Sequence, residues 1–80
     1  MHRYTVLLYP EPEGGYSAAV PSLPGCFTQG ETIDEALANA KEAAEGWLED
    51  AADQGEDIPE ENAVPIIAAI ELSELAGSPA

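Results

Sequence analysis

Basic side chains are almost absent from this 80-residue sequence, in which Arg3 and Lys41 stand against sixteen acidic residues and the formal net charge is −14. Affinity for nucleic acids comes largely from Lys and Arg side chains that displace counterions from the phosphate backbone. The composition therefore argues against direct nucleic-acid binding. A strongly negative surface attracts a basic protein partner and speeds the encounter, but acidic residues also serve solubility. Charge alone leaves both interpretations open.

Cysteine and histidine occur once each, as Cys26 and His2. A single cysteine cannot close an internal disulfide, which favours a reducing, cytoplasmic compartment over a secreted scaffold. With the only histidine at the start of the chain, the sequence offers neither a Ser-His-Asp set nor a histidine to activate the cysteine. We therefore expect no acyl-transfer chemistry and interpret Cys26 as a small buried residue.

Long apolar runs are also missing, so we expect neither a signal peptide nor a membrane span. The predicted strands carry hardly any Asp or Glu, whereas carboxylate-metal catalysis needs acidic groups that converge. We expect no metal, no other cofactor and no enzymatic activity. A chain of this size buries only about 60% of the surface that its unfolded form exposes. Because no disulfide reinforces so small a core, we expect a homo-oligomer, either a dimer or a tetramer.

The pattern of apolar and turn residues predicts an α+β fold in the order β-β-β-α-β. It comprises an antiparallel three-stranded meander, one long helix packed on one face, and a fourth strand. Pro21 and Pro24 end or kink the second strand, since proline has no amide proton to give the ladder. The predicted strands cover Arg3–Tyr9, Tyr16–Val20, Cys26–Gln29 and Val64–Leu72. Residues 1–72 form a single domain in this interpretation, and residues 73–80 form a flexible C-terminal tail.

A helix is predicted to begin after Thr32 and to end near Gln54. Thr32-Ile33-Asp34-Glu35 has the form of a capping box, in which the Thr32 hydroxyl meets the Glu35 amide and the glutamate side chain reaches back. Apolar residues at intervals of three and four predict a stripe that faces the sheet, made of Ile33, Ala36, Leu37, Ala40, Ala44, Trp47, Leu48 and Ala51. The opposite arc is acidic and comprises Asp34, Glu35, Glu42, Glu45, Glu49 and Asp53, with Asp50 at its edge.

The segment Val20–Ala36 concentrates two prolines, two glycines and the only cysteine in one connection before the helix. We interpret it as architecture that breaks the second strand, turns the chain at Gly25 and leads into the helix. Its effect on function is then indirect, because it sets the angle at which the acidic helix and the hairpin tip at Glu11–Glu13 are presented. Direct contact of this loop with a partner is the alternative.

Several segments in fixed order resemble the HicB-like antitoxin family over roughly Tyr4 to Leu72. They are Gly14–Val20, Pro21–Cys26, Gln29–Thr32, Glu35-Ala36 and Asn39–Ala43. The resemblance implies a fold similar to a partial RNase H domain without that enzyme's acidic centre, and a role in a toxin-antitoxin pair. It also implies a partner, a small basic HicA-like toxin that resembles a double-stranded-RNA-binding domain and cleaves mRNA with a histidine. Many such proteins continue into a C-terminal DNA-binding segment, whereas only residues 73–80 follow the last predicted strand here.

The leading hypothesis is an antitoxin-type module that neutralises a small basic toxin by covering its RNA-binding surface. The candidate contacts are our own inference and comprise Glu11 and Glu13 on the hairpin and Glu42, Glu45, Glu49 and Asp53 on the helix. One rival hypothesis is the remnant of a metal-dependent nucleic-acid hydrolase, with the metal held by the helical carboxylates. Another is an orphan domain with a structural or assembly role and no toxin.

Overall fold

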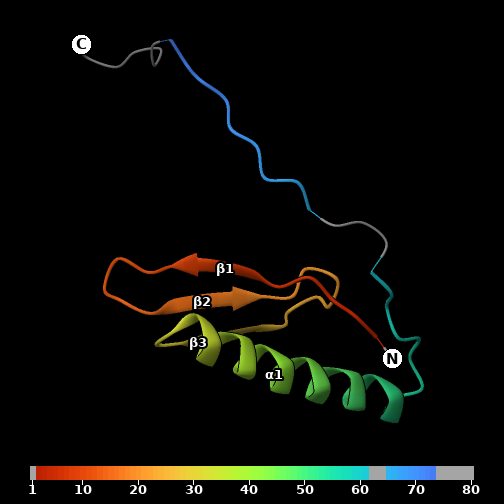
Figure 1. The fold of residues 1–80 in the computed structure, drawn as a ribbon. Helices are drawn as coiled ribbons and strands as arrows, with labels where there is room; N and C mark the ends of the chain where they lie inside the picture. The colour runs from red at the N-terminus through yellow and green to blue at the C-terminus, as the bar shows by residue number, and fades with distance from the viewer. Residues whose placement is uncertain (1, 62–64, 74–80) are drawn as a thin grey trace.

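A computed structural model of the chain describes residues 2–61 and 65–73 and contains three strands followed by one long helix (Figure 1). The elements are β1 (Leu7–Pro10), β2 (Tyr16–Ala19), β3 (Phe27–Gly30) and α1 (Ile33–Asp53). The strands form an antiparallel sheet in the order β1-β2-β3. Helix α1 lies across one face of it, chiefly over β3 and β2. The predicted α+β class, the meander and the single long helix are confirmed.

Strand β1 begins at Leu7, four residues later than the sequence predicts. The register that pairs Leu7 with Ala19 would place Thr5 opposite Pro21. Proline has no amide to donate, and the Thr5 amide donates instead to the Glu61 carboxylate at 2.9 and 3.0 Å. The ladder between β1 and β2 therefore ends before it reaches Thr5.

The connection between β2 and β3 is a compact loop that closes on itself. The Val20 amide donates to the Cys26 carbonyl, and the Leu23 and Cys26 amides donate to the Val20 and Leu23 carbonyls, all at 3.0–3.1 Å. Leu23 points inward and is the largest fully buried side chain among the described residues. The Trp47 indole Nε1 donates to the Pro24 carbonyl at 2.9 Å, which ties the loop to the helix. These contacts favour the interpretation of Val20–Ala36 as architecture.

The core consists largely of small residues, so that the helix can approach the sheet closely. Its buried cluster comprises Ala18, Val20, Leu23, Cys26, Ala36 and Ala40, with larger side chains such as Trp47 and Leu48 packed around it. Cys26 is buried, as predicted, and burial raises the pKa of its thiol above the ordinary value. A raised thiol pKa keeps the side chain protonated and unreactive at neutral pH.

Helix α1 begins and ends where its capping signals predict. The Thr32 hydroxyl accepts from the Glu35 amide at 3.0 Å, and Gln54 is the C-cap. The Glu35 carboxylate reaches back one residue further than expected, since it accepts from the Glu31 amide at 3.2 Å. Ile33 and Leu37 are 46% and 42% exposed, although the sequence places them on the stripe facing the sheet. Leu37 lies at the edge of the stripe toward β1, which α1 leaves uncovered, whereas Ile33 lies in line with the buried Ala40 and Ala51 but is the first residue of the helix.

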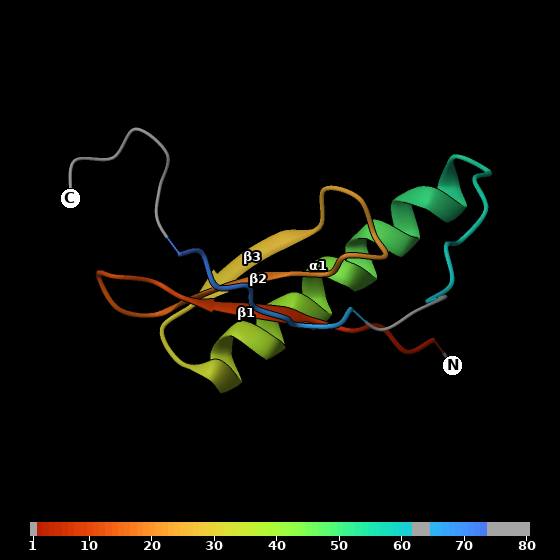
Figure 2. The ribbon, with the colours of Figure 1, turned by 90° about the horizontal axis from the view of Figure 1, so that it is seen from above.

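Residues 65–72 form no strand in this chain, although the sequence predicts a fourth strand over Val64–Leu72. They are extended coil without ladder pairing, and their large side chains are exposed. Figure 2 projects the segment over β1, whereas Figure 1 shows it well clear of the sheet on the side away from α1. The structure therefore does not show the predicted fourth strand over residues 65–72, which pair with no edge of the sheet. Val64 and the predicted tail beyond Ser73 lie outside the described residues, and the partial RNase H-like arrangement stays a prediction.

Candidate functional site

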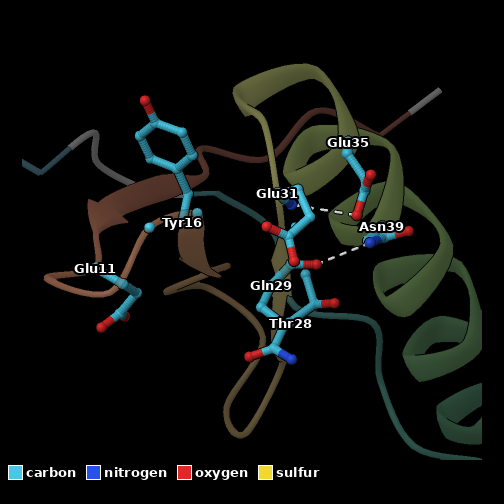
Figure 3. Close-up of a pocket in the computed structure, with 10 residues that line it drawn as sticks. Glu11, Tyr16, Thr28, Gln29, Glu31, Glu35 and Asn39 are labelled. Atoms are coloured by element: carbon cyan, nitrogen blue, oxygen red, sulfur yellow. Dashed lines mark hydrogen bonds between the residues drawn. The ribbon is translucent and has the colours of Figure 1, made fainter.

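An acidic hollow of about 410 Å³ opens where the β1–β2 hairpin meets the end of β3 and the start of α1. Figure 3 shows the carboxylates of Glu11, Glu31 and Glu35 around it, together with polar side chains from β3 and α1. The register that pairs Tyr16 with Gly30 brings the hairpin turn next to Glu31. The hollow therefore combines acidic groups from three separate places in the chain.

The walls of the hollow are held by hydrogen bonds. The Glu35 carboxylate accepts from the Glu31 amide, and the Asn39 side chain donates from Nδ2 to the Gln29 carbonyl at 2.8 Å (Figure 3). Glu11 is positioned by its backbone, since its amide donates to the Gly15 carbonyl and its carbonyl accepts from the Gly14 amide, both at 3.0 Å. Glu35 also lies in the first turn of α1, where the helix dipole stabilises a negative charge.

The predicted helical contacts, Glu42, Glu45, Glu49 and Asp53, are all exposed. At about 100° per residue they fall within an arc of about 80°, on the side of α1 opposite Ala40 and Ala51. Glu35 precedes Glu42 by seven residues and so lies on the same arc. The helical acids and Glu35 of the hollow thus lie on the same side of α1, with Glu35 two turns before Glu42.

We call this surface the acidic face. It comprises Glu11, Glu31, Glu35, Glu42, Glu45, Glu49 and Asp53. The Lys41 Nζ atom lies 3.8 Å from the Glu45 Oε2 atom in an exposed i,i+4 ion pair. Such pairs contribute little to stability because water screens them. Glu13, the other predicted hairpin contact, is exposed at the hairpin tip and does not line the hollow.

Sequence reasoning placed Glu35 on the acidic arc of the helix as well as in the capping box, but did not connect it with Glu11 or name it as a contact. It left Glu31 without a role in this surface. A signal was present, because three acidic residues, Glu31, Asp34 and Glu35, flank the helix start within five positions. Their proximity to Glu11 depends on the hairpin register, which the linear pattern does not reveal.

A metal-dependent hydrolase requires carboxylates that converge on one point, and the helical carboxylates do not converge. They follow one another along the helix and face outward. Within residues 2–61 and 65–73, no group of three or more His, Cys, Asp or Glu side chains is arranged to hold a metal ion. The hydrolase hypothesis thus gains no ligand cluster from this part of the chain.

Outside the acidic face, the Glu61 carboxylate has a structural role that the sequence does not indicate. It accepts from the Thr5 amide, from the Thr5 hydroxyl and, at 3.0 Å, from the Ser22 hydroxyl. These hydrogen bonds, first of all that from the Thr5 side chain, hold the pKa of the Glu61 carboxyl below its ordinary value of 4.5. The Tyr4 hydroxyl also donates to the Pro59 carbonyl at 2.5 Å. The segment after α1 is thereby tied down beside the residues that precede β1.

The described part of the chain is thus a small α+β domain with an acidic face. Among the described residues, no helix combines the length and the hydrophobicity of a membrane span. A family model described as the HicB-like antitoxin of bacterial toxin-antitoxin systems matches residues 4–77. The chain belongs to this family, which confirms the resemblance that its sequence motifs carry.

Individual relatives agree with this assignment. A UPF0150 protein of Thermoplasma acidophilum is 47% identical over 64 residues, which cover 80% of this chain and 93% of that protein. A UPF0150 protein of Synechocystis is 41% identical over 64 residues, or 80% of this chain and 81% of the relative. The antitoxin HicB of Escherichia coli K12 is 51% identical over 41 residues, which cover 51% of this chain but only 30% of that protein. Family membership supports an antitoxin role and implies a toxin partner.

Proposed function

We propose that this chain is an antitoxin that neutralises a small basic, HicA-like toxin by laying its acidic face over the toxin's RNA-binding surface. The observation that carries the proposal is that Glu35 of the acidic hollow and the exposed acids of α1 share one side of the helix. A surface that binds the RNA backbone gains much of its affinity from Lys and Arg side chains. Carboxylates spread along a helix about 30 Å long can occupy such a surface in place of phosphates.

Charge also supports a binding role for this surface over a purely solubilising one. The sequence has only two Lys or Arg residues, Arg3 and Lys41, against sixteen Asp and Glu residues. The acidic face therefore keeps almost its full charge for an encounter with a cationic partner. Complementary charge of this kind raises the association rate more than it lowers the dissociation rate.

No reaction is assigned to the chain itself. In this proposal the antitoxin acts by blocking access, so the carboxylates need to be exposed and complementary to the toxin but need not converge. Residues 10–15 and the start of α1 then form one end of the contact, and the middle of α1 forms the rest. We expect the pair to act in the cytoplasm, which the single reduced Cys26 favours.

The test is co-expression of the chain with the small basic reading frame encoded next to it, followed by co-purification and measurement of mRNA cleavage. A triple variant, Glu42→Lys, Glu45→Lys and Glu49→Lys, reverses the middle of the acidic face. We expect it to lose affinity for the toxin by about tenfold or more and to release mRNA cleavage. Wild-type binding should weaken steeply as salt increases.

The matched control reverses the same number of acids elsewhere on the chain. Glu56→Lys, Asp57→Lys and Glu60→Lys are all exposed, lie after α1 and change the net charge by the same amount. This control should bind the toxin with the affinity of the wild type. Circular dichroism should show equal helix content in both variants. Equal loss of affinity in both would mean that only net charge matters. No loss in either, or no basic partner encoded beside the chain, would favour the orphan-domain hypothesis.

A further inference from the structure

Strand β3 is an edge of the sheet, because β2 pairs with one side of it and no strand among the described residues pairs with the other. In an antiparallel pair, alternate residues direct their backbone groups toward the partner strand. The Cys26 carbonyl, one residue before β3, accepts from the Val20 amide, one residue after β2. The residues two and four positions after Cys26, which are Thr28 and Gly30, therefore bond with β2.

The two residues that alternate with these, Phe27 and Gln29, direct their backbone groups outward to the open side of β3. One of these groups has a partner from the helix, since the Gln29 carbonyl accepts from Asn39 Nδ2 at 2.8 Å in an exposed hydrogen bond (Figure 3). We call the outward side of Phe27–Gly30 the β3 edge. An uncovered edge of this kind is a template for pairing with an extended segment of another chain.

The flank of α1 that runs beside the β3 edge is acidic. Asn39 marks this flank, because its side chain reaches the edge strand. At about 100° per residue, Glu35 and Glu42 lie within about 60° of Asn39 around the helix axis, and Asp50 lies within about 20° of it. Lys41, the basic residue of α1, lies about 160° away from Asn39. A segment laid on the β3 edge therefore has carboxylates along one of its sides.

The other side of the β3 edge is apolar. Side chains of a strand alternate between the two faces of the sheet, and α1 covers the face that carries the buried Ala18. Phe27 pairs with Ala19, so it lies on the face away from α1, where it is 72% exposed. Neither β3 nor its neighbour β2 carries a charged side chain. A segment laid on the edge therefore meets an exposed aromatic ring on this face.

We propose that the toxin is held by strand addition, in which an extended segment of the toxin pairs with the β3 edge. This inference rests on the antitoxin proposal and specifies how the partner is bound. The segment alternates Lys or Arg side chains, which point toward the acids of α1, with apolar side chains, which point toward Phe27. Main-chain hydrogen bonds supply affinity and the alternation supplies specificity. On binding, the Asn39 side chain releases the Gln29 carbonyl, which then accepts from an amide of the toxin.

A second copy of this chain does not have the chemistry that the β3 edge requires. Arg3 and Lys41 are the only Lys and Arg residues of the sequence, so no segment of it alternates basic and apolar residues. Two β3 edges brought together would also bring two acidic flanks of α1 together, and like charges across an interface disfavour the wrong partner. The Asn39 side chain meanwhile occupies one of the edge carbonyls in the free chain.

The first test compares two variants at one position, with the basic protein encoded beside the chain as the probe. Gln29→Pro removes an outward amide and leaves the hydrogen bonds between β3 and β2 in place, since proline is tolerated where the amide of an edge strand faces outward. Gln29→Ala keeps that amide and is the control. We expect Gln29→Pro to weaken binding by about tenfold or more, because a main-chain hydrogen bond is lost, and Gln29→Ala to bind like the wild type.

Phe27→Ala tests the apolar side of the same edge. It should weaken binding by about tenfold, because the segment loses the ring against which its apolar side chains pack. The control is Tyr9→Ala, which removes an exposed aromatic side chain from β1, the strand at the other edge of the sheet. This control should leave the affinity unchanged. Circular dichroism should show equal helix content in all four variants.

The second test uses the wild-type chain and measures amide hydrogen exchange by NMR, free and in complex with the same basic protein. In the free chain the amides of Thr28 and Gly30 should exchange slowly, because they bond with β2, and those of Phe27 and Gln29 should exchange fast. In the complex the Phe27 and Gln29 amides should slow by about tenfold or more. This measurement decides the question if Gln29→Pro loses helix content.

The outcomes distinguish strand addition from the antitoxin proposal. Strand addition is overturned if the Phe27 and Gln29 amides gain no protection in the complex, or if folded Gln29→Pro binds as tightly as Gln29→Ala. The antitoxin proposal then stands as long as the triple Glu-to-Lys variant of α1 loses the toxin. Protection of the two amides that grows with the concentration of the free chain would assign the edge to a second copy and overturn the inference. A wild type that binds no basic protein encoded beside it would overturn both proposals.

Discussion

Gly30 occupies the point at which the sheet and α1 come closest. A Cβ atom at this position would lie 2.8 Å from both the Ala36 Cα and the Glu35 carbonyl carbon, and would clash with the Ala36 amide. These are backbone atoms of the first turn of α1, so they cannot move aside without displacing the helix. A glycine is required here by packing, since its φ is not in the left-handed region.

Gly30→Ala is therefore expected to destabilise the protein by about 1–3 kcal/mol or more through overpacking. Urea unfolding followed by circular dichroism would measure the effect. The matched control is Gly46→Ala in the middle of α1, where an added Cβ meets nothing within 4 Å. This control should stabilise the protein by about 0.5–1 kcal/mol through helix propensity. Similar effects of the two substitutions would contradict the proposed close approach at Gly30.

At the scale of elements, α1 is the part of the molecule that could be predicted most completely from the sequence. Its start depends on Thr32 and Glu35, and its end on Gln54 and Gly55, all of which act through hydrogen bonds within a few residues. The positions of the three strands could be predicted, but their first and last residues could not. The start of β1 depends on Pro21, fourteen residues beyond Leu7, and on Glu61 at the far side of the helix.

The link between the post-helix segment and the start of β1 yields a pH-dependent prediction. The hydrogen bonds from Thr5 lower the pKa of Glu61 in the folded state. A lowered pKa means that ionised Glu61 stabilises the fold above its ordinary pKa of 4.5, and that this contribution is lost as pH falls through the folded-state pKa. The variant Glu61→Gln removes the charge. At neutral pH it should be less stable than wild type, and the difference should shrink in acid below pH 4.5.

Urea unfolding of both proteins across this pH range provides the measurement, and Glu60→Gln is the control. Glu60 is the exposed neighbour of Glu61. Its substitution should leave the free energy of unfolding close to that of wild type at every pH. A Glu61→Gln deficit that stays constant into acid would contradict the role given to the ionised carboxylate.

At the scale of the whole molecule, charge repulsion dominates the electrostatics. The formal net charge is −14, and several pairs of acidic residues lie at i,i+3 or i,i+4 along α1. Each such pair destabilises the helix by about 0.2–0.5 kcal/mol. In about 10 mM salt the Debye length is about 30 Å, similar to the length of α1, and it falls to about 8 Å at about 150 mM. Salt in this range therefore screens most of the repulsion between the acidic residues.

The midpoint of thermal unfolding should accordingly rise by about 4–8 °C between these two salt concentrations, which corresponds to about 1 kcal/mol. The variant Glu42→Gln/Glu45→Gln/Glu49→Gln/Asp53→Asn has less repulsion to screen and should gain clearly less. Calorimetry at fixed protein concentration would measure both. A wild-type midpoint that does not change with salt would contradict the idea that charge repulsion strongly destabilises the folded state.

The sequence by itself determined the class of fold, the helix with its caps, the burial of Cys26, the acidic arc of α1 and membership of the HicB-like antitoxin family. These features depend on composition, on local hydrogen bonds and on periodicity, which can be followed along a linear chain. Only the tertiary structure decided that Glu11, Glu31 and Glu35 share one hollow, that Glu61 anchors Thr5, and that residues 65–72 leave the sheet. Each of these depends on strand register or on contacts between residues far apart in the chain, which a linear pattern does not specify.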